Sequence, residues 1–121
     1  MDRAKFKGVF SALLTPYTAD GKINGNSVKK IVDMNLSKGI NGFYVGGSTG
    51  EGMMLTLEER KQLFKYAADS NSGRGTMIAH VGTINTEHAI EMAKYAEECG
   101  YDAISAVAPY YYGFSYEAIK G

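Results

Sequence analysis

The 121-residue chain has no tryptophan, only two prolines and a single cysteine, Cys99. One cysteine cannot form an internal disulfide, and its position on the apolar face of an expected helix predicts a small buried side chain. No window approaches the ~18 continuous apolar residues of a membrane span. The N-terminus also lacks the apolar stretch of a secretory signal. The sequence therefore predicts a cytoplasmic protein.

An excess of either charge is also missing. Thirteen basic and thirteen acidic side chains cancel, and Lys and Arg form no run or stripe. We therefore expect no surface for nucleic acid or for an anionic membrane. The spacing of His, Cys and carboxylate residues resembles no zinc or two-metal site, so no metal is expected.

Short apolar runs alternate with helical patterns along the chain. Four runs bounded by Gly or Pro predict parallel strands buried on both faces; they lie at 8–16, 42–48, 76–82 and 103–109. Apolar residues at helical spacing separate these runs. The expected N-caps of the three helices are Asn26, Thr56, which has the capping-box spacing with Glu59, and Thr86.

Repeated strand–helix units leave two architectures, a doubly wound open sheet or a (β/α)8 barrel, which typically needs ~250 residues. Four units would form half a barrel with two unpaired sheet edges and an uncovered apolar face, so we expect a partner or self-association. A fourth helical pattern begins at Ser115 and stops at Gly121. The chain is therefore expected to be truncated at the start of its fourth helix.

The glycine-rich stretch 45–52, VGGSTGEG, does not match the phosphate-binding motifs. Met53 and Met54 stand where a P-loop needs Lys and Ser or Thr, and Leu55 stands where a Rossmann motif needs its last glycine. The carboxylate of Glu51 would also repel a phosphate. Phosphate binding is therefore not expected.

The same stretch offers two adjacent hydroxyls, Ser48 and Thr49, flanked by glycines at the carboxyl end of an expected strand. Glycines allow a ligand to approach backbone N–H groups closely, an arrangement that suits one carboxylate. The alternative is that the glycines only form a tight turn and the hydroxyls bond to the local backbone. Composition and spacing leave both possibilities open.

Aromatic and imidazole side chains occur near the same end of the expected sheet. Three tyrosines at 110–112 either relay protons or pack against a neighbouring element or subunit. His80, on the third expected strand, is interpreted as a hydrogen-bonded core histidine. His88, after a helix start, is expected to be exposed.

Together these motifs resemble the pyruvate-dependent class I aldolases typified by N-acetylneuraminate lyase and dihydrodipicolinate synthase. The resemblance runs the whole length of the chain, from ALLTP at 12–16 through GGSTGE at 46–51 to the tyrosines after Pro109. GGSTGE, AHVG at 79–82 and the YYGFS ending are similar to the lyase branch. The synthase branch usually has two threonines in the loop and Ala-Gly-x-Gly on strand three.

The resemblance implies an α/β fold in which residues 1–121 form the N-terminal half, strands one to four, of a homotetrameric (β/α)8 barrel. It implies small-molecule substrates, pyruvate and sialic acid, and no cofactor. A lysine forms a Schiff base with the substrate, and the iminium accepts the electrons left when the C–C bond breaks. The retro-aldol products are pyruvate and N-acetylmannosamine.

By the same resemblance, Ser48 and Thr49, beside Gly47, match the hydroxyls that bind the pyruvate carboxylate. Ser48 also matches a member of a Ser-Tyr-Tyr proton relay, and Tyr111 matches the tyrosine that reaches the neighbouring subunit's site. The expected supporting residues are Tyr44, Thr15 and Glu51.

The family's Schiff-base lysine lies on strand six and its main catalytic tyrosine on strand five, and neither strand falls within this sequence. The lysines here precede strand one, lie in a loop, belong to helices or, for Lys120, are terminal. Such wet positions do not lower a lysine pKa as a desolvated pocket does. The chain alone is therefore expected to be inactive. Two alternatives remain: another pyruvate aldolase, such as dihydrodipicolinate synthase or one acting on 2-keto-3-deoxy sugar acids, and a noncatalytic half-barrel that self-associates.

Overall fold

Four short parallel strands form the sheet of the computed structural model, which describes residues 2–110 and 112–121. Neighbouring strands follow chain order, and all three pairings are parallel. The strands are β1 (Phe10–Ala12), β2 (Gly42–Val45), β3 (Thr76–His80) and β4 (Ala103–Ser105). Each is shorter than its predicted run because the chain leaves the ladder early and forms a loop at the carboxyl end. The predicted strand–helix alternation is confirmed.

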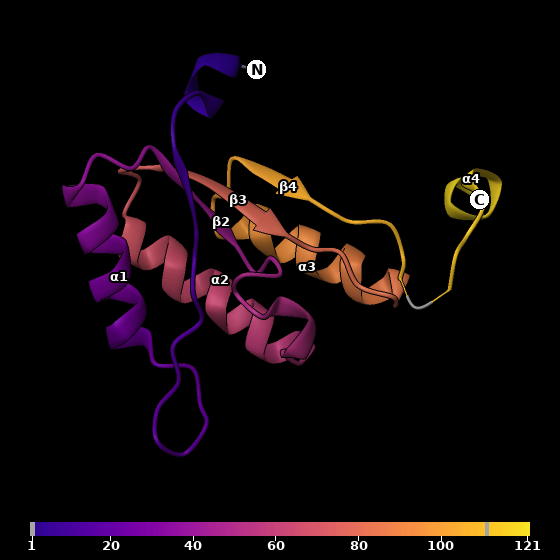
Figure 1. Ribbon diagram of the computed structural model, residues 1–121, viewed down its shortest axis with the longest axis horizontal. Coiled ribbons are helices and arrows are strands. Elements are labelled where there is room, and N and C mark those ends of the chain that lie inside the picture. The colour runs from indigo at the N-terminus through magenta and orange to yellow at the C-terminus, as the bar shows by residue number, and fades with distance from the viewer. Residues whose placement is uncertain (1, 111) are drawn as a thin grey trace.

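Helices lie between the successive strands, and one short helix lies near each end of the chain. They are η1 (Arg3–Phe6), α1 (Gly25–Ser37), η2 (Gly52–Met54), α2 (Leu57–Asn71), α3 (Thr86–Glu98) and α4 (Tyr116–Lys120). In chain order α1 packs on α2 and α2 on α3, whereas α4 stands apart at the end of an arm (Figure 1). Among the described residues, no helix has the length and apolar character that a membrane span requires.

One face of the sheet is covered by the helices. Alternate side chains of β2 and β3, among them Phe43, Val45 and Ala79, are fully buried in a core shared with α1, α2 and α3. The residues between them, Tyr44 and Ile78, lie on the opposite face and are only half-buried. Within the described part of the chain this second face has no covering layer, as expected of half a barrel.

Helix starts agree with the sequence at α2 and differ at the other two helices. Thr56 forms the predicted capping box: its Oγ1 accepts from the Glu59 backbone N at 3.2 Å, and its own N–H donates to the Glu59 carboxylate at 2.8 Å. The predicted caps Asn26 and Thr86 are wrong. They lie inside their helices, because asparagines one or two residues upstream supply the capping oxygen.

Those asparagines are Asn24 and Asn85. Each side-chain oxygen accepts a hydrogen bond from a backbone N–H three residues later, at 3.1 Å in both helices. Gly25 is the first residue of α1, and a larger residue would not fit there because the Tyr66 ring occupies the space that its Cβ would need. Asparagine at the cap satisfies one of the free amides of the first turn.

Cys99 is only half-buried, whereas the sequence predicted a buried side chain. It is the C-cap of α3, and the chain turns away at Gly100 with φ +83°. Because the helix ends at this residue, its apolar stripe no longer covers the thiol. Burial and the neighbouring Tyr95 act on the thiol in opposite directions, and burial raises its pKa.

Removal of the Phe64 ring should destabilise the fold strongly. The ring is fully buried, its Cε1 lies 3.0 Å from where a Cβ on Gly46 would be, and its centroid lies 5.5 Å from that of Tyr101. We expect Phe64→Ala to lower the free energy of unfolding by about 3–5 kcal/mol. Urea denaturation measures this change. The exposed Lys94 provides a control, and Lys94→Ala should change it by less than about 0.5 kcal/mol; similar losses for both variants would contradict the assigned core.

Candidate functional site

The glycine-rich loop at the carboxyl end of β2 is packed backbone against backbone. A Cβ on Gly52 would lie 2.0 Å from the carbonyl oxygen of Gly46, and the Gly52 N–H donates to the Gly47 carbonyl at 3.0 Å. Gly46 itself has φ +76°, a left-handed conformation that favours glycine. These glycines are therefore required by close contact within the loop, in addition to the bend itself.

The other two loop glycines lie against a side chain of β2 and against the segment that follows β1. A Cβ on Gly47 would lie 2.6 Å from the ring of Tyr44, and one on Gly50 would lie 2.6 Å from the carbonyl oxygen of Leu13, just after β1. Thr15 Oγ1 donates to the Gly50 carbonyl at 2.5 Å. The loop is thus fixed on both sides by contacts that include the Tyr44 ring and the Thr15 hydroxyl.

Ser48 and Thr49 are exposed at the tip of this loop. Among the described residues neither hydroxyl makes a hydrogen bond, and the backbone N–H groups of Ser48, Thr49 and Gly50 have no acceptor. The next amide, of Glu51, is already bonded to the Ser48 carbonyl at 3.0 Å. Bonding of the hydroxyls to local backbone, the alternative left open by the sequence, is therefore not found. A group of consecutive free N–H donors beside two hydroxyls can hold an anion.

Glu51 occupies the left-handed region, with φ 56°, at the start of η2. A non-glycine residue in this region stores strain of about 1–3 kcal/mol. Its side chain is exposed, and its charge adds to burial in raising the pKa of the Tyr17 phenol. Glu51 therefore shapes the turn, and its charge acts on Tyr17.

A buried arginine that the sequence did not reveal lies under the loop. Arg60, in the first turn of α2, is only 3% exposed. Its Nη1 donates to the Gly82 carbonyl at 2.8 Å, and its Nη2 donates to the carbonyls of His80 and Gly46, the latter at 3.4 Å. Burial lowers its pKa, although a guanidinium stays charged. Its helical spacing to Leu63 and Phe64 places it on the apolar stripe, and that spacing could have identified it.

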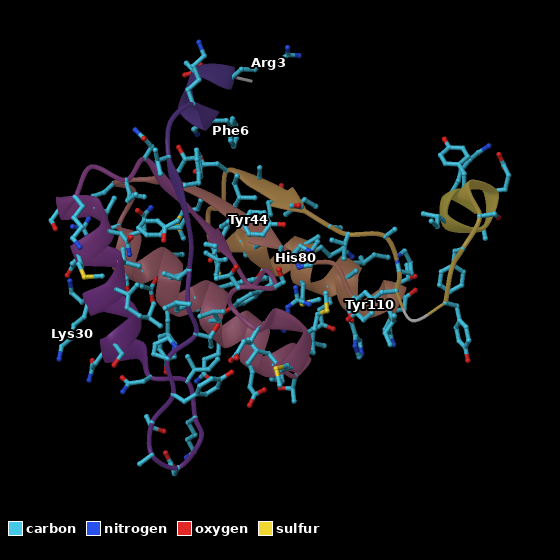
Figure 2. The ribbon with its side chains drawn as sticks, in the orientation of Figure 1. Arg3, Phe6, Lys30, Tyr44, His80 and Tyr110 are labelled. Atoms are coloured by element: carbon cyan, nitrogen blue, oxygen red, sulfur yellow. The ribbon has the colours of Figure 1, made fainter. Side chains whose placement is uncertain are left out.

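His80 is a buried, hydrogen-bonded core histidine, as predicted. Its Nε2 accepts from the Val107 backbone N at 3.3 Å, so the neutral ring has its proton on Nδ1. Burial lowers the pKa of His80, the Arg60 charge lowers it further, and a hydrogen bond with the Gly46 backbone opposes both effects. Tyr44 and His80 lie beside one another (Figure 2). The centroids of their rings are 6.0 Å apart. His80 therefore links the loop after β2 to the chain after β4.

The tyrosines after β4 are only partly described. Tyr110 is half-buried and lines a cavity with Arg60, Thr83 and His88. His88 is exposed, as predicted. Tyr111, expected to be a catalytic residue, lies outside the described residues. The proposed relay between Ser48 and this tyrosine therefore remains a prediction.

None of the lysines lies on a strand or in the loops at the carboxyl ends of β2, β3 and β4. Lys5 pairs with Asp102 at the opposite end of the sheet, and Lys61 on α2 pairs with Glu91 at 2.9 Å. Residues 2–110 and 112–121 also contain no group of three His, Cys, Asp or Glu side chains that could hold a metal ion. The described site thus has anion donors without an amine nucleophile.

Comparisons with known proteins gave consistent matches. The model of the dihydrodipicolinate synthetase family matches residues 5–121. N-acetylneuraminate lyase from Pasteurella multocida is 50% identical over 115 residues, 94% of this chain and 39% of that protein. The chain therefore spans well under half the length of the curated relatives that it matches.

Solved structures gave the same result. N-acetylneuraminate lyase from Mycoplasma synoviae superposes with a TM-score of 0.91 at 46% identity, over 96% of this chain and 40% of that one. Dihydrodipicolinate synthase from Bacillus anthracis gives 0.87 at 35% identity, over 94% and 39%. Both similarities rest on sequence as well as fold.

Replacement of Gly52 by alanine should distort the loop. Since the new Cβ would meet the Gly46 carbonyl, the backbone must shift, at a cost of about 1–3 kcal/mol in unfolding free energy. Gly113 has no atom within 4 Å of its Cβ position, so Gly113→Ala is the matched control and should be neutral. Thermal denaturation of both variants measures the difference; a Gly52→Ala variant as stable as the parent would contradict the close contact.

The depressed pKa of His80 predicts a stability that falls with acidification. In the fold the ring stays neutral below its ordinary pKa of about 6.5, whereas in the unfolded chain it binds a proton there. The free energy of unfolding should therefore decrease as pH falls from about 6.5 toward the folded-state pKa, by at most about 1.4 kcal/mol per unit. Urea denaturation between pH 7.5 and 5 measures this slope. His80→Gln should have a shallower slope, and equal slopes would contradict the assignment.

Proposed function

The chain belongs to the dihydrodipicolinate synthetase family, and on that premise we propose that it is the N-terminal half of an N-acetylneuraminate lyase. The whole protein would be a class I aldolase that cleaves N-acetylneuraminate into pyruvate and N-acetylmannosamine. Residues 1–121 would be the first four strand–helix units of its barrel. The observation that supports the proposal most directly is the loop tip, with free hydroxyls and free amides at the carboxyl end of β2.

Ser48 and Thr49 would bind the carboxylate of pyruvate, and the backbone beside Gly47 would let that carboxylate approach. Hydrogen bonds to a charged acceptor are shorter and stronger than neutral ones. The loop is fixed by Tyr44, Thr15 and its own glycine contacts, so it need not reorganise when the carboxylate arrives. No cofactor is needed for this role.

The amine would come from a lysine outside this chain. It would add to the substrate ketone with loss of water, and the resulting iminium would take up the electron pair released when the C–C bond breaks. A proton must leave the sugar hydroxyl in the same step. Ser48 and Tyr111 are proposed to relay that proton, Tyr111 from a neighbouring subunit of a tetramer. The tetramer would be cytoplasmic. In each subunit, the remaining strands of the barrel would cover the open face of the four-stranded sheet.

Two features favour the lyase over the synthase branch. The loop has Ser48 before Thr49, and β3 has His80, whose ring fills the space between Tyr44 and Val107. A synthase would use the same carboxylate loop with a different second substrate. Assays with the second substrate of each enzyme therefore distinguish the two activities.

The test uses the full-length protein of which residues 1–121 are proposed to form the N-terminal half. Pyruvate release from N-acetylneuraminate measures lyase activity, and borohydride in the presence of pyruvate traps the Schiff base for mass spectrometry. We expect cleavage and one adduct in the whole protein and neither in the 121-residue chain. An adduct on the short chain would contradict an external lysine. Condensation of pyruvate with aspartate semialdehyde in place of lyase activity would favour the synthase.

Ser48→Ala and Thr49→Ala in the whole protein should each raise the KM for pyruvate in the aldol direction by about tenfold, the loss of roughly 1.4 kcal/mol of carboxylate binding. Ser37 is an exposed serine on α1, and Ser37→Ala serves as the control with an unchanged KM. Unchanged KM values in both loop variants would place the carboxylate elsewhere.

A further inference from the structure

Arg60 is a buried cation with no carboxylate partner in the described part of the chain. It is 3% exposed, and none of the ion pairs there includes it. Its Nε also has no hydrogen-bond partner. A buried charge is costly unless its donors are satisfied. The contacts that satisfy the other two nitrogens therefore indicate what holds this side chain in place.

Those contacts are backbone carbonyls at the ends of two strands. Nη1 donates to Gly82 and Nη2 to Gly46 and His80, so one planar guanidinium ties the loop after β2 to the end of β3. The fork geometry of arginine permits these several bonds at once, which a lysine ammonium on a flexible stem does less well.

His80 extends the link to a third strand. Its Nε2 accepts the N–H of Val107, in the segment that leads from β4 to the tyrosines. Gly82 has no room for a side chain, because a Cβ would lie 2.9 Å from the Val107 nitrogen and 3.0 Å from the His80 ring. The ends of β2, β3 and β4 are therefore held by one buried cluster.

We propose that Arg60 and His80 are positioning residues for the aldol reaction, a role that rests on the proposed lyase function. They hold the glycine-rich loop after β2 in register with the segment from Val107 to Tyr110. In this role neither residue needs to contact the substrate. A displacement of the loop by a fraction of an ångström separates its hydroxyls from the carboxylate, so binding suffers before chemistry does. The positive charge of Arg60 beside Gly46 also favours a bound anion.

The test compares removal with conservative replacement in the whole protein. Arg60→Met and His80→Leu remove the links, Arg60→Lys keeps the charge, and His80→Gln keeps an acceptor for Val107. Arg74 is the matched control, because it is a half-exposed arginine that pairs with Asp33 at 2.5 Å. Circular dichroism at the assay temperature establishes that each variant is folded.

We expect Arg60→Met and His80→Leu each to raise the KM for pyruvate about tenfold, with kcat changed less than about threefold. His80→Gln and Arg74→Met should stay within about threefold of the parent, whereas Arg60→Lys, which keeps the charge without the fork of donors, should fall between Arg60→Met and the parent. The double variant should have a KM no higher than that of either single variant, because the two substitutions break the same link. Equal losses in removal and conservative variants, additive losses or an unchanged KM would overturn the positioning role.

Hydrogen exchange of the Val107 amide separates this proposal from the proposed function. Arg60→Met should accelerate that exchange about tenfold, because a loosened His80 ring no longer protects the amide. If the parent protein has no lyase activity, the proposed function is wrong and the exchange rate still decides the coupling. An active parent with unaltered Val107 exchange in Arg60→Met would overturn the coupling alone.

Discussion

The arrangement of the site depends on the close approach of backbone to backbone in the loop after β2. Gly46 and Gly52 meet across the loop at a distance that leaves no room for a Cβ, and Gly50 lies against the carbonyl of Leu13. Because the loop is closed in this way, its tip is free to present hydroxyls and amides to solvent. The position of the loop-tip hydroxyls and amides therefore depends on the glycines, which have no side chain, as much as on the residues that carry those groups.

Beneath that loop, a buried arginine adds polar contacts to the hydrophobic packing that joins α2 to the sheet. Arg60 lies in the first turn of α2, and about one turn later the same helix contributes the fully buried Phe64 to the core. The helix therefore supports the loop in two ways, with a ring against Gly46 and with a guanidinium on its carbonyl. His80 completes the support from β3. Packing and polar contacts act on the same few backbone atoms.

The fold was predictable from periodicity because β-strand and helix patterns alternate cleanly, and Thr56 with Glu59 marked the start of α2 correctly. The caps at Asn24 and Asn85 were missed because several polar residues compete at each start, and only backbone geometry selects one. Ser48, Thr49 and Gly47 were selected from spacing and resemblance; Ser48 and Thr49 are exposed at the loop tip, and the binding role of all three remains a prediction. Arg60 was missed despite its helical spacing to Leu63 and Phe64, because a charged residue is ordinarily assigned to the surface; its burial depends on carbonyls from strands distant in sequence.

The most direct measurement is a crystal structure of the whole protein with pyruvate trapped as its reduced Schiff base. The carboxylate oxygens should lie within hydrogen-bond distance, about 2.5–3.2 Å, of the Ser48 and Thr49 hydroxyls and their amides, with the linked lysine from outside residues 1–121. A carboxylate bound away from this loop, or a linkage to a lysine of this chain, would contradict the assignment of the site.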